Sequence, residues 1–270
     1  MIEKLSDILI VTDIDGTLLR EKLGISKENL AAIKRFIDKG GHFTVSTGRA
    51  IDVTGKVLTG IPINAPSIHI NGGYLYDWEK KKILEPNYLS PNAKKYCREI
   101  TRKFPFCDCH FAAEKAVNLM TSGNVLKKYI PEDELNFFDG EYEDIPDNVY
   151  KFIICCDPED MNGLRQYAES VCGGDVLLIQ SSEFFLEMLP LENSKGKALE
   201  KLCEIAGIPL ENSVAVGDFE NDIEMIRTAG LGAAVDNAQD GVKKAADIVL
   251  PSCEENAIAH LIGLLEEMYE

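Results

Sequence analysis

The sequence predicts an α/β protein with a parallel β-sheet, interrupted by a second domain of α+β type. Three observations carry this prediction. Short aliphatic runs alternate with helical patterns in the amino-terminal part of the chain, the same alternation resumes in the carboxyl-terminal part, and the stretch between them has a different character. Alternating strands and helices are typical of parallel sheets joined by right-handed crossovers.

The amino-terminal part is expected to form a β-α-β-α-β unit. Residues 8–11 are a continuous aliphatic run, which is typical of a strand buried on both faces. Ser26 is a candidate helix N-cap, and Gly40 is a candidate stop for the same helix. The elements expected after it are a strand over 42–47, a short helix over 51–59 and a strand over 67–70.

The carboxyl-terminal part resumes the alternation. A helix is expected over 194–206, because Gly207 closes a helical pattern there. The elements expected after it are a strand over 214–216, a helix over 221–229, strands over 231–235 and 248–250, and a final helix over 254–268.

Residues 79–189 are expected to form a separate α+β domain inserted into a core made of residues 1–78 and 190–270. This middle stretch holds most of the aromatic residues and longer polar connections, such as the one at 131–134. Its expected strands cover 116–120, 150–155, 176–179 and 184–188, and its expected helices lie near 91–103 and 158–171.

Composition narrows the class of protein. The formal net charge is -17, which disfavours binding to nucleic acid and to anionic membranes. No apolar run approaches the ~18 residues of a membrane span, and the first residues have no signal-peptide pattern, so we expect a cytoplasmic protein. The eight cysteines lie mostly inside apolar segments and are expected to be buried thiols.

Acidic residues follow two of the predicted strands. Asp13-Ile14-Asp15-Gly16-Thr17 comes after the first strand, and Gly217-Asp218-Phe219-Glu220-Asn221-Asp222 comes after the strand at 214–216. Ligands of open α/β sheets bind at the carboxyl ends of strands, and carboxylates with water suit Mg²⁺. The structural alternatives are an Asx turn at the first group and helix capping by Asn221 or Asp222 at the second.

Two further short segments have residues that are suited to bind an anion. In Ser46-Thr47-Gly48-Arg49, a hydroxyl and a glycine at a strand end can hydrogen-bond an anion together, although Thr-Gly turns are also common. In Asn193-Ser194-Lys195-Gly196-Lys197, a cation in the first turn of a helix opposes the helix dipole. Lys195 either extends into solvent or faces an anion at the helix terminus.

The order and spacing of these four groups resemble the haloacid dehalogenase (HAD) superfamily. More closely, the chain is similar to the Cof-type phosphatases, whose type IIB cap domain is inserted between the second and third motifs. Asn71-Gly72 also falls where such proteins carry an Asn-Gly element. Two segments depart from the family pattern, Val235-Asp236-Asn237-Ala238 and Asn256-Ala257-Ile258. The resemblance implies a Rossmann-like core with an inserted C2B-type cap.

The resemblance implies a Mg²⁺-dependent phosphatase that forms an aspartyl-phosphate. It makes Asp13 the nucleophile and a metal ligand, and Asp15 the acid and base that also lends its carbonyl to the metal. Asp218 and Asp222 complete the metal site. Phosphate-binding roles fall to the following residues: Thr47, Gly48, Arg49, Lys195 and Asn221.

The implied substrate is a small phosphorylated metabolite, such as a sugar phosphate, a nucleotide or a phosphorylated cofactor, and the cap is expected to act as a lid. A phosphotransferase of the phosphomutase kind is an alternative, because it shares the first half-reaction. A non-catalytic phosphate-binding module is a more remote alternative, because none of the expected catalytic groups is missing. The sequence leaves a monomer and a weak homodimer both open.

Overall fold

The computed structural model describes residues 4–20, 24–113, 117–121, 125–128 and 136–269. The chain divides into two compact units, Met1–Pro86 with Ser194–Glu270, and Asn87–Asn193. The first unit is called the core and the second the cap. The polar connection expected at 131–134 lies outside the described residues.

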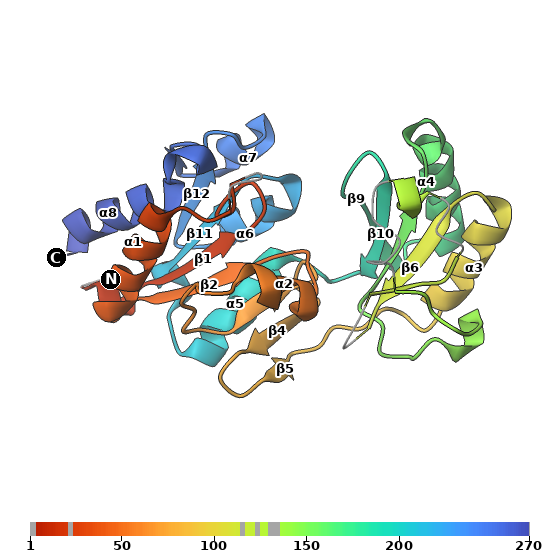
Figure 1. Ribbon diagram of the computed structural model, residues 1–270, viewed down its shortest axis with the longest axis horizontal. Coiled ribbons are helices and arrows are strands. Elements are labelled where there is room, and N and C mark those ends of the chain that lie inside the picture. Colours follow the sequence, from red (N-terminus) through yellow and green to blue (C-terminus); the bar gives the residue numbers. More distant parts are fainter. Residues whose placement is uncertain (1–3, 21–23, 114–116, 122–124, 129–135, 270) are drawn as a thin grey trace. The chain divides into compact units, whose positions relative to one another are not determined.

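The core is built on one sheet with the strand order β13-β12-β11-β1-β2-β3-β4-β5 (Figure 1). All neighbours from β13 to β3 are parallel, and β4 and β5 add an antiparallel hairpin. The strands are β1 Leu9–Asp13, β2 His42–Ser46, β3 Ser67–His69, β4 Tyr74–Asp77, β5 Lys82–Leu84, β11 Ser213–Gly217, β12 Leu231–Val235 and β13 Ile248–Leu250. The hairpin explains why the core extends to residue 86, whereas the sequence prediction ended it at 78.

Helices cover both faces of the core sheet. The helices are α1 Lys27–Asp38, α2 Ile51–Val57, α5 Lys195–Ala206, α6 Ile223–Thr228, α7 Asp240–Ala245 and α8 Ala257–Tyr269. The core also has short 3₁₀ turns, which are η1 Leu5–Asp7, η5 Leu210–Asn212, η6 Glu220–Asp222 and η7 Cys253–Glu255.

Alternate residues of β1 show how the two layers form. Ile10 packs into the cluster that contains α1 and α8, whereas Leu9 and Val11 pack into the cluster that contains α5. Every residue of β1 and β11 is buried, as expected for central strands covered on both faces. The sequence prediction of a doubly covered parallel sheet is therefore confirmed.

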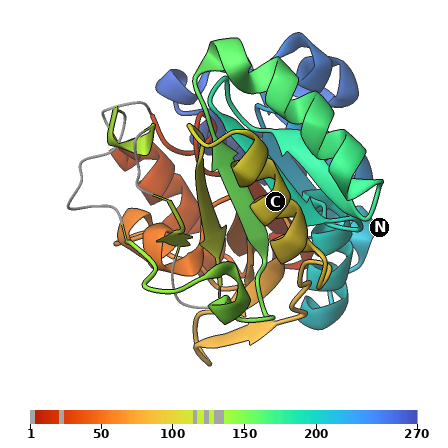
Figure 2. The same ribbon diagram turned by 90° about the vertical axis from the view of Figure 1, so that its right-hand side faces the viewer.

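The cap is an antiparallel sheet with the order β7-β6-β8-β10-β9. Its strands are β6 Asp108–Ala112, β7 Val117–Leu119, β8 Lys151–Cys155, β9 Val176–Gln180 and β10 Phe185–Pro190. Helices α3 Ala93–Lys103 and α4 Pro158–Cys172 lie side by side on one face of it (Figure 2), and the turns η2 Leu126–Lys128 and η4 Tyr142–Asp144 connect its elements. The expected α+β character is confirmed, and β6 is a strand that the sequence analysis did not anticipate.

Two expected helices begin later than predicted. The segment expected as a helix from residue 221 starts as the 3₁₀ turn η6, and α6 begins only at Ile223. The final helix begins at Ala257, because Asn256 before it adopts a left-handed backbone with φ 64°. Left-handed residues interrupt a right-handed helix, so η7 and α8 are separate elements.

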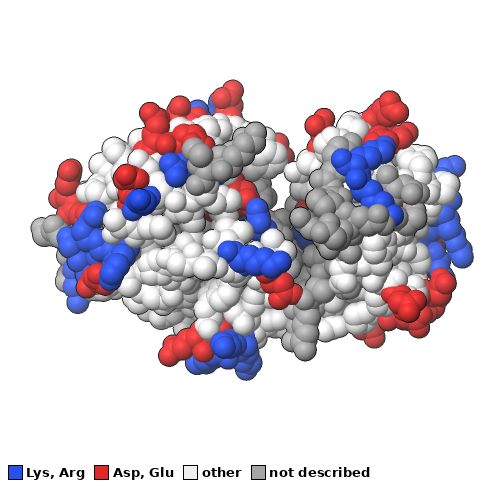
Figure 3. All heavy atoms as spheres, viewed as in Figure 1, with Lys and Arg blue, Asp and Glu red and all other residues white. Residues whose placement is uncertain are grey.

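The exposed charged side chains and the buried cysteines agree with what the amino-acid composition predicts. On the face in Figure 3, basic and acidic side chains lie in small mixed groups. Exposed ion pairs such as Lys34–Asp38 join side chains of opposite charge. Such exposed pairs contribute roughly 0–1 kcal/mol each. All eight cysteines are buried free thiols, as expected. Among the described residues, no helix has the length and apolarity to cross a membrane.

Candidate active site

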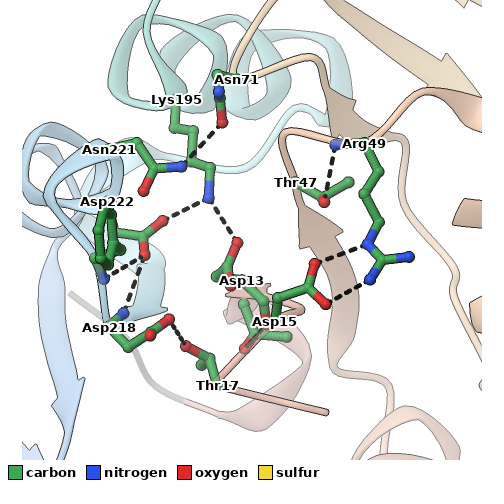
Figure 4. A network of polar contacts seen from close by, with 12 residues as sticks. Asp13, Asp15, Thr17, Thr47, Arg49, Asn71, Lys195, Asp218, Asn221 and Asp222 are labelled. Carbon is green, nitrogen blue, oxygen red and sulfur yellow. Dashed lines mark hydrogen bonds and ion pairs between the residues drawn. The ribbon is translucent and has the colours of Figure 1, made fainter. Parts of the chain in front are cut away.

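The candidate site lies where three neighbouring strands of the core sheet end. Asp13 is the last residue of β1 and pairs in register with Ser46, the last residue of β2. On the other side of β1, Thr12 pairs with Val216 of β11, so Gly217 and Asp218 follow at the same edge. The parallel sheet therefore brings the side chains of Asp13 and Asp218 together, as Figure 4 shows.

Three carboxylates form an acidic cluster at this edge. Oxygen atoms of Asp13, Asp218 and Asp222 all lie within 4.8 Å of one another. Asp13 is 7% exposed and Asp222 is fully buried. Carboxylates this close repel one another unless a cation lies between or beside them.

Lys195 supplies one positive charge to this cluster. Its Nζ donates hydrogen bonds to Oδ1 of Asp13 and to Oδ1 of Asp222, both at 2.6 Å, and its side chain is completely buried (Figure 4). The alternative in which Lys195 extends into solvent is wrong. Burial by itself lowers the pKa of Lys195, but Asp13 and Asp222 outweigh this effect and raise it above its ordinary value.

Two of the three carboxyl groups, Asp13 and Asp218, have raised pKa values even with Lys195 present. Burial raises the pKa of Asp13, Lys195 opposes the rise, and Asp222 adds to it. Burial also raises the pKa of Asp218, to about 6. Negative charge is thus in excess at this site when only protein groups are considered.

Local hydrogen bonds fix the two acidic loops. Oδ2 of Asp222 accepts from the backbone N–H groups of Asp218 and Phe219, at 3.0 and 3.1 Å. Thr17 donates its hydroxyl to Oδ1 of Asp218 at 2.8 Å, which ties the loop after β1 to the loop after β11. Asp222 thus caps the 3₁₀ turn η6 as well as belonging to the cluster, but its side chain makes no capping hydrogen bond at the helix α6.

Gly16 is required by this close approach of the two loops. Its φ is +81°, in the left-handed region, and a Cβ on it would lie 2.6 Å from Oδ2 of Asp218. A side chain at this position would therefore strain the backbone and displace Asp218.

The loop after β2 carries Thr47, Gly48 and Arg49. The backbone N–H of Arg49 donates to Oγ1 of Thr47 at 3.1 Å, which orients that hydroxyl. The guanidinium of Arg49 donates from Nε and Nη2 to the two carboxylate oxygens of Asp15, at 2.7 and 2.6 Å. Arg49 was expected at the phosphate, and in this structure its partner is the carboxylate of Asp15.

Asn221 lies beside Asn71 and donates from Nδ2 to its Oδ1 at 3.0 Å (Figure 4). Asn71 adopts a left-handed backbone, with φ 55°, at the turn after β3. The backbone N–H of Asn71 donates to the carbonyl of Thr47 at 3.0 Å, so this turn also supports the loop after β2. Asn71 belongs to the Asn-Gly pair of the sequence, but that pair alone predicts no role for its side chain.

Comparisons with known proteins place the chain in a family. A model of haloacid dehalogenase-like hydrolases matches residues 10–262. The chain therefore belongs to the haloacid dehalogenase-like hydrolase family, as the four motifs predicted.

Curated relatives of similar length are named as phosphatases. The chain is 30% identical to the 5-amino-6-(5-phospho-D-ribitylamino)uracil phosphatase YwtE of Bacillus subtilis, over 95% of this chain and 97% of that protein. It is 28% identical to the pyridoxal phosphate phosphatase YbhA of Escherichia coli, over 94% and 97%. The prediction of a phosphomonoesterase of the HAD type is confirmed at this level.

Solved structures share the fold. A haloacid dehalogenase-like hydrolase from Bacteroides thetaiotaomicron aligns with a TM-score of 0.86 and 26% identity, over 96% of this chain and 99% of that one. The sugar phosphatase BT4131, described as HAD subclass IIB, aligns with a TM-score of 0.80 and 21% identity, over 96% and 99%. The predicted type of cap domain is therefore confirmed as a matter of fold.

Proposed function

We propose that this protein is a Mg²⁺-dependent phosphatase that hydrolyses a small phosphorylated metabolite through an aspartyl-phosphate on Asp13. The observation that carries the proposal is the position of Asp13. This buried carboxylate is held by Lys195 at the edge of a carboxylate cluster, at the strand ends where α/β enzymes bind their ligands.

The residues at the cluster fit Mg²⁺. If all are ionised, Asp13, Asp218, Asp222 and Lys195 leave two negative charges, which a divalent cation would balance. Mg²⁺ prefers carboxylate oxygens and keeps several waters. Asp13 and Asp218 would hold it directly with the carbonyl of Asp15, and Asp222 would hold its water. When bound, the ion neutralises charge on the phosphoryl oxygens.

Asp13 is the nucleophile in this proposal. An approaching phosphate ester is itself negative, so attack by a carboxylate needs positive charge nearby. Lys195 is protonated and already within hydrogen-bonding distance of Asp13, so it can shield the attacking group and a phosphoryl oxygen together. Asp13 forms a bond to phosphorus as the bond from phosphorus to the ester oxygen breaks.

Asp15 is the acid and base. In the first step it gives a proton to the departing alcohol, and in the second it takes a proton from the water that attacks the aspartyl-phosphate. Its side chain is 51% exposed, so it can reach both a leaving group and water. Arg49 orients it through the paired hydrogen bonds.

Thr47 and Gly48 are proposed to bind a phosphoryl oxygen through the Thr47 hydroxyl and the Gly48 N–H. Removing one such donor costs roughly 10²–10³ in rate in enzymes that stabilise developing charge. Asn221, held by Asn71, is proposed to contact the phosphate from the opposite loop.

The substrate class follows from the family rather than from a single residue. The similar phosphatases from B. subtilis and E. coli are named for a phosphorylated ribitylaminouracil and for pyridoxal phosphate. Both are phosphate monoesters of small polar metabolites. This supports a substrate of that class for the present chain.

The test is phosphate release from a panel of phosphomonoesters, with and without Mg²⁺, for the wild type, Asp13→Asn and the control Asp38→Asn. Asp38 lies in an exposed ion pair on α1, so its variant should retain full activity. We expect release only with Mg²⁺ and only from the wild type and the control. An Asp13→Asn protein that retains the wild-type rate would refute the proposal.

A further inference from the structure

A series of buried and partly buried hydrogen bonds connects Trp78 to the loop after β2, through side chains that have no role in the proposed mechanism. Trp78 donates from Nε1 to Oγ of Ser67 at 2.7 Å, and Oγ of Ser67 lies 2.7 Å from Nε2 of His69. On the other side of the ring, Nδ1 of His69 lies 3.3 Å from the carbonyl oxygen of Arg49 and 3.4 Å from Oγ1 of Thr54.

The two ends of this series fix the direction of every hydrogen bond in it. An indole N–H only donates and a backbone carbonyl only accepts. Thr54 uses its hydroxyl proton on the carbonyl of Ala50 at 2.9 Å, so its oxygen also accepts at the ring. Both neighbours of Nδ1 of His69 are therefore acceptors, and Nδ1 must carry the proton.

The acceptor atoms in this series of hydrogen bonds are then determined as well. Nε2 of His69 is unprotonated and accepts from the hydroxyl of Ser67, whose oxygen in turn accepts from Trp78. The ring has no exposed surface, and burial lowers the pKa of His69 to about 4, so it is neutral. Tyr74 stacks on it with 5.2 Å between ring centres and restricts its orientation.

This series of hydrogen bonds holds the loop after β2 in place. The carbonyl of Arg49 accepts from Nδ1 of His69 and from the backbone N–H of Ile70, both at 3.3 Å. This carbonyl belongs to the residue whose N–H orients the Thr47 hydroxyl and whose guanidinium holds Asp15. A rotation of the Arg49 backbone would disturb both of these contacts.

We infer that His69, in its Nδ1–H form, is a positioning residue for catalysis, which orients Thr47 and Asp15 through the backbone of Arg49. The inference rests on the proposed function of that site. His69 lies on β3 and has no role in the four motifs. Its imidazole is needed because one donor must face the loop while one acceptor faces Ser67.

Two variants separate positioning from packing. In His69→Asn the side-chain amide lies where Nδ1 lies, so it can still donate to the carbonyl of Arg49. In His69→Gln the amide lies near the position of Nε2, and the donor toward Arg49 is lost. The Asn variant leaves the larger cavity. If His69 had a purely structural role, His69→Asn should therefore lose at least as much activity as His69→Gln.

We expect kcat to fall roughly tenfold to a hundredfold in His69→Gln, with little change in KM, because the loop acts on the developing charge. In His69→Asn kcat should stay within a few-fold of the wild type. His42→Asn, at the opposite end of neighbouring β2, is the control and should match the wild type. Equal kcat losses in Asn and Gln, or an unchanged kcat in Gln, would overturn the inference.

A second readout does not depend on activity. ¹⁵N NMR of the wild type at neutral pH should show His69 protonated at Nδ1 and unprotonated at Nε2. The opposite tautomer would overturn the inference whatever the enzyme does. If the wild type hydrolyses no phosphomonoester, the proposed function fails, and the tautomer still decides whether the series of hydrogen bonds exists as described.

Discussion

Arg49 holds Asp15 through two parallel hydrogen bonds, at 2.7 and 2.6 Å, between a guanidinium and a carboxylate. The two residues come from loops after neighbouring strands, β1 and β2. Paired contacts of this kind fix the plane of a carboxylate as well as its position. A residue expected to bind phosphate is thus placed to orient the proposed acid and base.

The role of Asp15 predicts a dependence on the leaving group. Asp15→Asn should lower kcat/KM for an alkyl phosphate by roughly 10²–10⁴, because the alcohol must be protonated as it departs. With p-nitrophenyl phosphate the loss should be much smaller, because that phenolate leaves without a proton. Steady-state kinetics with both esters measure the contrast. Equal losses would exclude Asp15 as the acid.

The role of Arg49 predicts that its shape matters as well as its charge. Arg49→Lys keeps the positive charge but lacks the planar fork, so Asp15 loses its fixed orientation. We expect kcat for the alkyl phosphate to fall by about tenfold, an order of magnitude consistent with small misplacements of catalytic groups.

The same kinetics provide the check on Arg49. In a protein that already carries Asp15→Asn, the Arg49→Lys change should have little further effect. Full additivity of the two substitutions would show that Arg49 acts independently of Asp15.

The buried position of Lys195 predicts a stability effect. Lys195→Met leaves Asp13 and Asp222 without their shared cation, and breaking a buried pair of this kind costs about 3–5 kcal/mol. Burial already raises the pKa of Asp13, and losing Lys195 raises it further. A carboxyl whose pKa is raised in the folded state lowers stability as pH rises from its unfolded value toward the raised one, so Lys195→Met should be less stable at pH 8 than at pH 5.

Urea denaturation of Lys195→Met in metal-free buffer at the two pH values measures this effect. The matched control is Lys197→Met, an exposed lysine in the same first helical turn. The control should unfold like the wild type. A Lys195→Met protein as stable as the control at pH 8 would contradict the assignment of this ion pair.

The carboxylate cluster predicts stabilisation by Mg²⁺ with a specific pH dependence. At a Mg²⁺ concentration 100 times the Kd, the free energy of unfolding should rise by about 2.7 kcal/mol. Burial raises the pKa of Asp218 to about 6 in the metal-free protein. Protons compete with the metal below that value, so the thermal shift should grow as pH rises from 5 to 7.

Thermal unfolding with Mg²⁺ and with chelator provides the measurement. Asp218→Asn should abolish the Mg²⁺-dependent shift, and Asp240→Asn, at the start of α7, should retain it. A shift of equal size in both variants would place the metal elsewhere.

The sequence was sufficient to predict which strand ends carry the candidate site. Asp13 and Asp218 follow aliphatic runs, and parallel strands bring such positions to one edge, so their meeting follows from topology alone. The position of Lys195 was left open by local sequence, because a first-turn lysine is compatible with both solvent and a buried anion. In the folded protein, Lys195 is buried and paired with the carboxylate of Asp13.

Contacts that depend on backbone geometry were not predictable. Asn71 reaches Asn221 from a left-handed turn, and Thr17 reaches Asp218 across 201 positions in sequence. The only sequence signals were the Asn-Gly pair and a threonine in a turn, which are common in ordinary loops.

The missed strand β6 has a physical reason. Asp108 begins it as a buried acid, which the strand pattern disfavours. Its carboxylate accepts from the backbone N–H groups of Val125 and Leu126, at 2.6 and 2.9 Å, and this offsets the cost of burial. The partners lie in a later loop, so the sequence of the strand alone does not reveal them.

The stereochemistry at phosphorus tests whether Asp13 is the nucleophile. A phosphomonoester made chiral at phosphorus with oxygen isotopes would be hydrolysed by the wild type, and the configuration of the released phosphate determined. Transfer to Asp13 followed by transfer to water involves two in-line displacements, so we expect net retention of configuration. Net inversion would mean that water attacks the ester directly, and it would contradict a nucleophilic role for Asp13.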